Sequence, residues 1–139
     1  MMHEIKFRAW DMNNMFFIEY INFPIKYIRG STESGEQCIL SKNAILMQYT
    51  GLKDKNNKEI YEGDIICGVW YFHHILYENA IVERDTFVIG EYGIKADTWI
   101  VNKKNLQRIP LHSLSDIEVV GNIYENPELL NKKVKQYRK

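Results

Sequence analysis

Apolar and polar residues alternate at the start of the chain in the manner of a half-buried β-strand. Residues 5–10 place apolar side chains at a period of two, interrupted by lysine and arginine. Asp11 and the pair Asn13-Asn14 follow, and both residue types suit a tight turn because they tolerate left-handed backbone. Residues 15–20 then resume an apolar, aromatic run. The pattern predicts an N-terminal β-hairpin.

Short apolar segments separated by turn residues predict strands over most of the remaining chain. The clearest strand begins after Gly63 and Asp64, because glycine can supply positive φ and aspartate can bond nearby backbone N–H groups. A turn is expected at Arg84-Asp85. Strands are expected at residues 37–40, 45–49, 65–70, 80–83, 86–89, 94–100 and 117–123. Many short strands favour a sandwich or a small barrel over alternating strands and helices.

The end of the chain has a different pattern, which predicts a helix over residues 127–139. Asn126 suits the N-cap and Pro127 the first helical position. Leu130, Val134 and Tyr137 recur at helical spacing and would form one apolar face. The other faces carry the cations Lys132, Lys133, Lys135 and Arg138.

Composition adds a bias toward aromatic side chains and a neutral overall charge. The 139 residues fit one domain, or one domain with a small attached lobe, and nine Tyr, six Phe and three Trp favour β structure. Eighteen basic and eighteen acidic residues balance to a net charge of zero. This balance argues against a dedicated duplex-binding protein, which needs a basic face. A local excess of positive charge occurs at residues 127–139, which hold five Lys or Arg and one Glu. This segment leaves nucleic acid open as a partner.

Cysteine usage and hydropathy indicate a cytoplasmic protein with reduced thiols. Cys38 and Cys67 are not at CxxC spacing. No segment approaches the length of about 18 consecutive apolar residues that a membrane span requires. Charged residues close to the first methionine interrupt any signal-peptide core. We therefore expect no membrane partner.

No arrangement of residues predicts catalysis, a cofactor or a metal site. His3, His73, His74 and His112 lack the spacing of metal ligands, and adjacent residues on a strand point to opposite faces. Cys67 lies within an apolar strand, which is typical of an inert thiol. No nucleophile is accompanied by a recognisable base and orienting group. We expect a non-enzymatic protein without cofactor or metal.

The aromatic cluster formed by Trp70, Tyr71, Phe72 and Tyr77 admits two interpretations. Such side chains stack on bases in single-strand-binding proteins, but they also fill protein cores. Core packing is favoured because stacking platforms normally accompany a basic groove. The basic C-terminal helix is similarly ambiguous: it could dock on the protein, contact nucleic acid, or bind a partner.

Three segments resemble the YopX family of phage and prophage proteins. They are FRAWD at residues 7–11, LMQYTGLKDKNNKEIYEGDI at residues 46–65, and VVGNIYENPELL at residues 119–130. The middle segment is the longest and most specific. Residues 66–118 carry little of the resemblance.

The resemblance implies a mainly β protein of phage or prophage origin in the bacterial cytoplasm, with a small SH3-like barrel. The expected domains are an N-terminal β-hairpin lobe with its connecting loop at residues 1–59, and an SH3-like β-barrel with a C-terminal helix at residues 60–139. The resemblance carries no catalytic or binding residues over to this chain. It supplies a fold and a setting, without a mechanism.

The signature segments combine aromatic bodies with polar tips, a composition found in interfaces as well as in cores. We therefore interpret Arg8, Trp10, Tyr49 and Tyr61 as candidate partner-binding residues. The partner would be another protein or a second copy of the chain. The leading functional expectation is a non-enzymatic protein-binding module that serves as an accessory protein of a mobile element.

The alternative expectation is a nucleic-acid-binding protein. In that case the cations of the predicted helix would contact phosphates, and exposed aromatic side chains would stack on bases. The candidate contact residues are Lys132, Lys133, Lys135 and Arg138.

Overall fold

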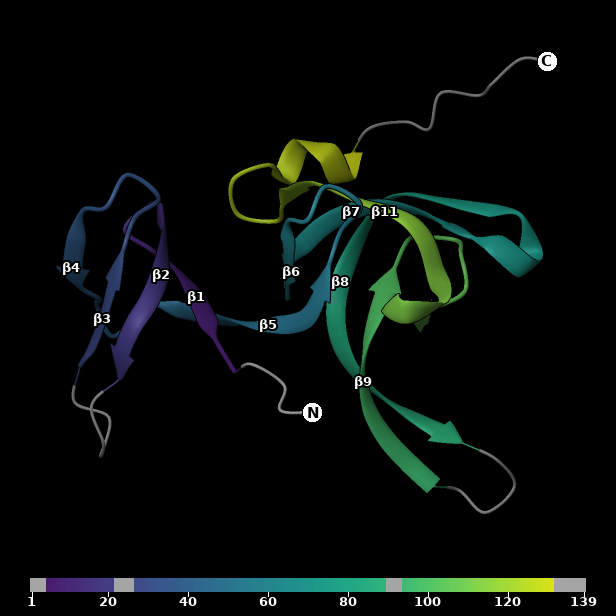
Figure 1. Ribbon diagram of the computed structural model, residues 1–139, viewed down its shortest axis with the longest axis horizontal. Coiled ribbons are helices and arrows are strands. Elements are labelled where there is room, and N and C mark those ends of the chain that lie inside the picture. Colours follow the sequence, from purple (N-terminus) through teal and green to yellow (C-terminus); the bar gives the residue numbers. More distant parts are fainter. Residues whose placement is uncertain (1–4, 22–26, 90–93, 132–139) are drawn as a thin grey trace. The chain divides into compact units, whose positions relative to one another are not determined.

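The computed structural model describes residues 5–21, 27–89 and 94–131, and it consists mainly of two antiparallel sheets (Figure 1). The chain divides into two compact units, Met1–Gly51 and Leu52–Lys139. The division falls within a strand and lies N-terminal of the predicted boundary after residue 59. The expectation of a mainly β protein is confirmed.

The first unit contains the strands of a meander that begins with the predicted hairpin. Met12 and Asn13 have φ of 48° and 60°, as both central residues of a two-residue hairpin turn with the right twist require. The sheet has the order β4-β3-β2-β1-β5-β6. Its strands in this unit are β1 (Phe7–Asp11), β2 (Asn14–Ile21), β3 (Ile28–Ser31), β4 (Gln37–Ile39) and β5 (Ile45–Lys53).

The core of the first unit is small. Among the described residues, Ala9, Phe16 and Leu40 form its buried apolar cluster, and Met47 and Tyr49 are buried as well. Asp11 is also buried, and its two carboxylate oxygens accept hydrogen bonds from the backbone N–H and the hydroxyl of Ser41, at 2.7 and 2.6 Å. This pair ties the end of β1 to the loop that follows β4.

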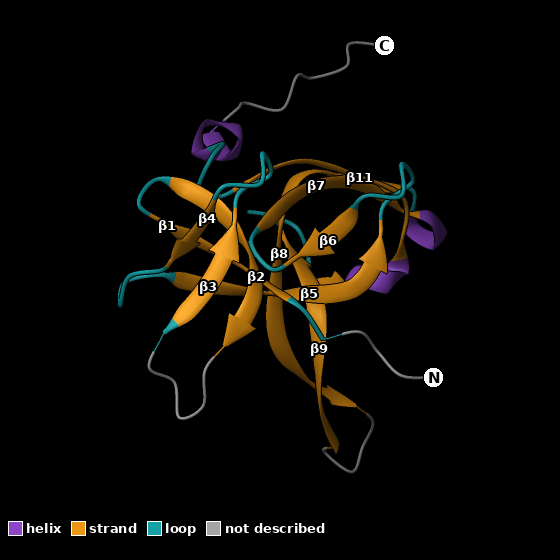
Figure 2. Cartoon of the chain, turned by 60° about the vertical axis from the view of Figure 1, so that its left-hand side comes forward, coloured by secondary structure: helices purple, strands orange, loops and turns teal. Residues whose placement is uncertain are grey.

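The second unit is a five-stranded sheet with the order β10-β9-β8-β7-β11, preceded by the short strand β6. Figure 2 shows that helical turns are minor features beside the strands. The strands are β6 (Glu59–Tyr61), β7 (Asp64–Trp70), β8 (Ile75–Ile89), β9 (Ile94–Asn102), β10 (Ile109–Pro110) and β11 (Leu114–Asn122). The 3-10 helices are η1 (Tyr71–His73), η2 (Leu111–Ser113) and η3 (Pro127–Asn131).

The core of the second unit is the larger of the two. Tyr77 is fully buried at its centre, and its hydroxyl donates to the backbone carbonyl of Gln107. Burial raises the pKa of the Tyr77 phenol, which therefore stays protonated and able to donate. The other buried members are Ile60, Ile66, Ala80, Val82, Val101, Ile109, Leu111 and Leu114.

Hydrogen bonding between the described strands does not close the second sheet into a barrel, so the expectation of an SH3-like barrel stays a prediction beyond the mainly β fold. β10 and β11 are the two edges of the sheet, and they do not pair with one another. β10 contains two residues, of which Pro110 has no N–H to donate. The three-residue helix η2 nevertheless joins these edges covalently. The sheet is therefore open but must curl enough to bring one end of each edge together.

The helix predicted over residues 127–139 is not supported. Its described part is η3, a 3-10 segment of five residues, and residues 132–139 lie outside the described residues. Asn126, the predicted N-cap residue, makes a different hydrogen bond. Its side-chain oxygen accepts from the Asn122 backbone N–H at 3.2 Å. The Leu129 N–H bonds the Asn126 carbonyl three residues earlier, which is 3-10 geometry.

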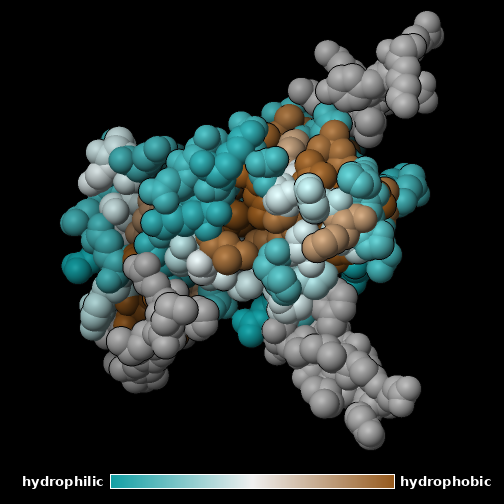
Figure 3. All heavy atoms as spheres, turned by 45° about the vertical axis from the view of Figure 1, so that its right-hand side comes forward, coloured by the Kyte–Doolittle hydropathy of each residue, from teal (hydrophilic) through white to brown (hydrophobic). Residues whose placement is uncertain are grey.

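The surface retains several apolar side chains beside hydrophilic ones. Figure 3 shows hydrophobic surface interrupted by hydrophilic surface on the face that it presents. Within residues 5–21, 27–89 and 94–131, no helix combines the length and the apolar character that crossing a membrane requires.

Candidate functional site

The four residues predicted to bind a partner lie in or near the interior. Arg8, Tyr49 and Tyr61 expose 6%, 6% and 3% of their surface, and Trp10 is half-buried. The Lys6 ammonium lies 5.3 Å from the centre of the Tyr49 ring. Arg8, Tyr49 and Tyr61 therefore offer almost no area to a partner of the folded chain. Trp10 keeps part of its surface exposed.

The polar segment between β5 and β6 is organised by one buried aspartate, Asp54. One of its carboxylate oxygens accepts hydrogen bonds from the backbone N–H groups of Asn56 and Lys58, both at 2.9 Å. The other accepts from the N–H of Val119 on β11, also at 2.9 Å. The turn is thereby fixed internally and fastened to a strand that is distant in sequence.

Two opposing effects act on the ionisation of Asp54. Burial of the carboxyl favours the neutral form and raises its pKa, but the N–H donors of Val119, Lys58 and Asn56 together outweigh burial. The charge of Lys58 acts in the same direction as these donors. The pKa of Asp54 is therefore held below its usual value. The carboxylate is ionised at neutral pH and serves as a structural acceptor.

A second buried aspartate organises the turn that leads into β7. Asp64 accepts a hydrogen bond from the Tyr61 N–H at 2.8 Å. Gly63 has φ of 85°, and its N–H donates to the carbonyl of Val82 at 2.8 Å. Its carbonyl accepts from the N–H of Ile123 at 3.0 Å. The segment at residues 46–65, which carries the most specific part of the family resemblance, thus forms these turns and attaches them to neighbouring strands by hydrogen bonds.

The exposed aromatic side chains of the second unit gather at the turn between β7 and β8. We call this turn the aromatic hairpin tip and define it as Trp70, Tyr71, Phe72, His73 and His74. It consists of Trp70 at the end of β7, then η1, then His74, whose φ of 52° lets its N–H bond the Tyr71 carbonyl at 3.3 Å. Figure 1 shows the β7–β8 hairpin, in teal, extending to this turn beyond the rest of its sheet.

The base of the tip is anchored and its end is exposed. Trp70 packs against the core, with its ring 6.5 Å from that of Tyr77 in an edge-on arrangement and 3.9 Å from that of His73. Phe72 exposes 87% of its surface and Tyr71 64%, and their rings meet edge to face at 5.9 Å. Tyr71 and Phe72 therefore form an exposed apolar protrusion on a turn whose base is packed against the core.

The hairpin tip contains no acidic residue, lysine or arginine. No Lys, Arg, Asp or Glu occurs between Trp70 and Tyr77, and the first charged residue after the tip is Glu78. Leu76, on the strand that leaves the tip, exposes a further 49% of its surface. The tip can therefore contribute apolar burial to a contact but little electrostatic attraction.

The predicted core placement of the aromatic cluster is correct for Trp70 and Tyr77 and wrong for Tyr71 and Phe72. The sequence did contain a signal for this division. Four consecutive rings, at residues 70–73, cannot all face one core from a strand whose side chains alternate. Some of them had to point outward or lie in a turn.

Other candidate chemistry is dispersed across the part of the chain that the structure describes. His73, His74 and His112 are exposed, and His3 lies outside the described residues. Cys38 and Cys67 are half-buried free thiols. Among the described residues, no three His, Cys, Asp or Glu side chains are grouped so that they could hold a metal ion. The predicted nucleic-acid contacts Lys132, Lys133, Lys135 and Arg138 also lie outside the described residues.

Comparison with known proteins places most of the chain in one family. The family model described as "YopX protein" matches residues 6–131. Among solved structures, protein EF1440 from Enterococcus faecalis is similar, with 25% sequence identity and a TM-score of 0.49. That similarity covers 93% of this chain and 99% of the Enterococcus chain. No curated protein matches.

Proposed function

The chain belongs to the YopX family, and we propose that it acts as a non-enzymatic protein-binding module whose contact surface is the aromatic hairpin tip. The observation that carries this proposal is the 87% exposure of Phe72 at the end of an anchored hairpin. Burying such a side chain in a partner would contribute roughly 1.5–3 kcal/mol. Aromatic anchors of this kind dominate the binding energy of many interfaces.

The shape of the tip favours a concave partner. Tyr71 and Phe72 lie on one short turn, and full burial of an aromatic side chain removes roughly 150–250 Å² from water. Two such side chains alone provide less area than the roughly 1,200 Å² of a small stable interface. We therefore propose that the tip inserts into an apolar pocket and that surrounding contacts complete the interface.

The proposed setting is that of an accessory protein of a phage or prophage in the cytoplasm of its bacterial host. The family resemblance supports this setting. The resemblance also supports an SH3-like fold for the second unit, in which β11 pairs with β7 and η2 links the sheet edges. Binding without catalysis is consistent with the use of the buried Asp54 and Asp64 carboxylates as acceptors for backbone N–H groups.

The alternative function is binding of single-stranded nucleic acid. Exposed rings at Tyr71 and Phe72 favour it, because bases stack on such side chains. The absence of any lysine or arginine from residues 70–77 weighs against it, because stacking platforms normally accompany a basic groove. In this alternative the predicted phosphate contacts are Lys132, Lys133, Lys135 and Arg138.

A pull-down from bacterial lysate, with and without nuclease, distinguishes the two functions. We expect a discrete protein to be retained after nuclease treatment by the wild-type chain. Phe72→Ser should reduce its capture at least about tenfold, the effect of losing about 1.4 kcal/mol. Ile39→Ser is the matched control, because Ile39 exposes 63% of its surface on β4 of the other unit.

Two other outcomes would contradict the proposal. Equal capture by Phe72→Ser and the wild-type chain would exclude the tip as the contact surface. Recovery that collapses on nuclease treatment would favour nucleic acid instead. In that case charge reversal of Lys132, Lys133 and Lys135 should weaken binding and flatten its dependence on salt.

A further inference from the structure

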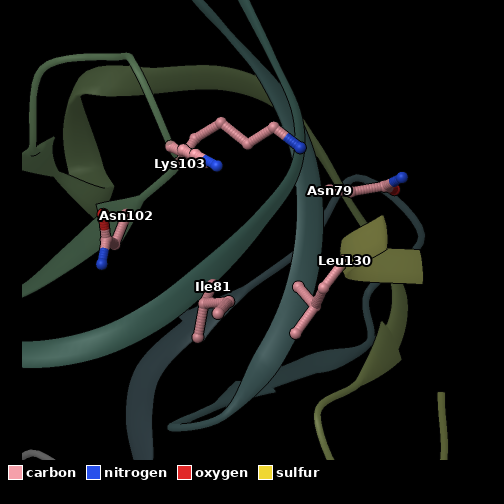
Figure 4. A pocket seen from close by; sticks show the side chains of 6 residues that line it. Asn79, Ile81, Asn102, Lys103 and Leu130 are labelled. Carbon is pink, nitrogen blue, oxygen red and sulfur yellow. The ribbon is translucent and has the colours of Figure 1, made fainter. Parts of the chain in front are cut away.

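A cavity of about 380 Å³ lies in the second unit, beside η3. Its size falls within the range of roughly 300–1,000 Å³ that is typical of small-molecule sites. Figure 4 shows it between the ribbons of β8 and η3 and the turn after β9. The residues that line it are Asn79, Ile81, Asn102, Lys103, Lys104 and Leu130.

A bulge in β8 builds the wall on the η3 side. The pairing of β8 with β7 shifts register between Ile66 and Gly68, and Asn79 at this point has φ of 53°. The bulge directs the Asn79 side-chain amide toward η3, where it donates to the carbonyl of Leu129 at 3.1 Å. This bond holds η3 beside β8 and places the half-buried Leu130 in the wall.

The opposite wall is fixed by the end of β9 and the turn that follows. Asn102 is the direct cross-strand partner of Ile81, so both stand on adjacent strands at the same level. The turn after them is closed by a bond from the Leu106 N–H to the Lys103 carbonyl at 3.0 Å. Figure 4 shows the Lys103 side chain reaching from this turn toward β8. The cavity walls are thus held by hydrogen bonds of the chain itself.

The lining is positively charged at one end and apolar at the other. Lys103 and Lys104 contribute two ammonium groups, whereas Ile81 and Leu130 contribute aliphatic surface. None of the described lining residues is acidic. The nearby carboxylate of Glu83 faces the Asn102 amide, with both oxygens 3.4 Å from its nitrogen. A ligand that matches this lining has an anionic group joined to an apolar body.

We propose that this cavity binds a small organic anion, with its acidic group at Lys103 and Lys104 and its apolar part between Ile81 and Leu130. A phosphate ester and a carboxylate share this chemistry. The two lysine ammonium groups attract an anion through Coulomb interaction. Enclosure by the two aliphatic side chains adds apolar burial that a bare inorganic ion cannot use.

Amide chemical-shift titration of the full ¹⁵N-labelled chain tests this proposal. The probes are adenosine monophosphate, hexanoate and inorganic phosphate. We expect at least one organic probe to cause saturable shifts at Asn79, Asn102 and Lys103. Its dissociation constant should rise at least about tenfold in Lys103→Glu/Lys104→Glu, since about 1.4 kcal/mol corresponds to that factor.

Three comparisons make the titration specific. Lys42→Glu is the matched charge control, because Lys42 is an exposed lysine of the first unit, and it should leave the titration unchanged. Leu130→Ala should weaken an organic probe more than inorganic phosphate. Phe72→Ser should have no effect, so failure of the proposed protein-binding function would not be mistaken for failure of this site.

Defined outcomes would overturn the proposal. One is the absence of saturable shifts at the cavity with both organic probes at concentrations up to about 10 mM, beyond the millimolar limit of weak specific binding. Another is unchanged binding in Lys103→Glu/Lys104→Glu variants whose spectra remain folded. A third is inorganic phosphate binding as tightly as either organic probe. Preference for adenosine monophosphate or for hexanoate would show which of the two organic anions the cavity accepts better.

Discussion

At the scale of single residues, three buried aspartates organise turns of the described chain by accepting hydrogen bonds from nearby groups. Asp11 holds Ser41, Asp54 holds the turn after β5, and Asp64 holds the turn before β7. All three fall within segments that resemble the family signature. A buried donor left without its acceptor costs about 1–3 kcal/mol, which explains why a turn residue can be as critical as a core residue.

Replacement of Asp54 by asparagine should destabilise the second unit by about 2 kcal/mol. Asparagine keeps one acceptor oxygen but replaces the other with an NH₂ group. This NH₂ group would face one of the backbone N–H groups that now donate to Asp54. Urea unfolding followed by tryptophan fluorescence would measure the change. Asp116→Asn is the matched control, because Asp116 is exposed and its φ of 53° suits asparagine. An equal effect of both substitutions would contradict the role assigned to Asp54.

Stability should also depend on pH through Asp54. Its pKa is lower in the folded chain than the ordinary value of 3.8, so the unfolded chain binds the proton more readily. The contribution is complete above the unfolded-state pKa and is lost as pH falls below 3.8 through the folded-state value. Urea midpoints measured from pH 7 to pH 3 should fall more steeply for the wild-type chain than for Asp54→Asn. Parallel curves would show that the carboxylate does not titrate as described.

At the scale of elements, the β7–β8 hairpin divides along its length into a buried base and an exposed end. Its base contributes Tyr77 and Trp70 to the core, and its end presents Tyr71 and Phe72 to solvent. The division arises because η1 interrupts the alternation of the two strands. Side chains on this turn are released from the requirement that every second residue face the core.

Substitutions along this hairpin should therefore affect stability very differently. Phe72→Ser should change the free energy of unfolding by no more than about 0.5 kcal/mol, because the side chain is exposed and makes no core contact. Tyr77→Phe should cost about 1–3 kcal/mol, because it leaves the Gln107 carbonyl without its buried donor. Thermal unfolding of both variants would measure the contrast. A large loss in Phe72→Ser would mean that the tip is part of the fold.

The long strand β8 shows how pairing can override a local turn signal. The sequence predicts a turn at Arg84-Asp85, but β8 continues through both residues, which pair with Trp99 and Thr98 of β9. The Arg84 guanidinium lies 5.8 Å from the centre of the Trp99 ring, and Arg108 forms an ion pair with Asp85. Cross-strand contacts of this kind stabilise each pair by roughly 0.2–1 kcal/mol. Their sum outweighs the turn preference of one aspartate.

At the scale of the whole molecule, the two units have cores of unequal size. Nine buried residues form the described core of the second unit, whereas three form that of the first. Hydrophobic burial is the main favourable term in folding, so the second unit should resist local opening more strongly. The edge strand β4, with three residues, is the least supported part of the first unit.

Native-state hydrogen exchange should reveal this difference. We expect the slowest amides at Ile66, Ala80 and Val82 in β7 and β8, and faster exchange at Arg29 and Cys38 in β3 and β4. Exchange rates that are equal in the two groups of strands would contradict the inequality inferred from the cores. The measurement is made on the intact chain, so it requires no assumption that either unit folds alone.

The sequence by itself determined the local features of this protein. Alternation of apolar residues, with Met12 and Asn13 at the turn, is sufficient for the first hairpin, and Gly63 with Asp64 is sufficient for the start of β7. These features depend on neighbouring residues, and local preferences are readable from the order of residues alone. The same holds for the signature segments that identify the family.

The tertiary structure alone decided which side chains are buried and which are presented. Tyr49 and Tyr61 lie inside whereas Phe72 lies outside, although all three are aromatic. The bulge at Asn79 and the open edges of the second sheet were likewise not predicted. The physical reason is that alternation along a strand assigns side chains to two opposite sides but does not determine which side packs against the core. That choice depends on residues far away in the chain, which come together only in the folded protein.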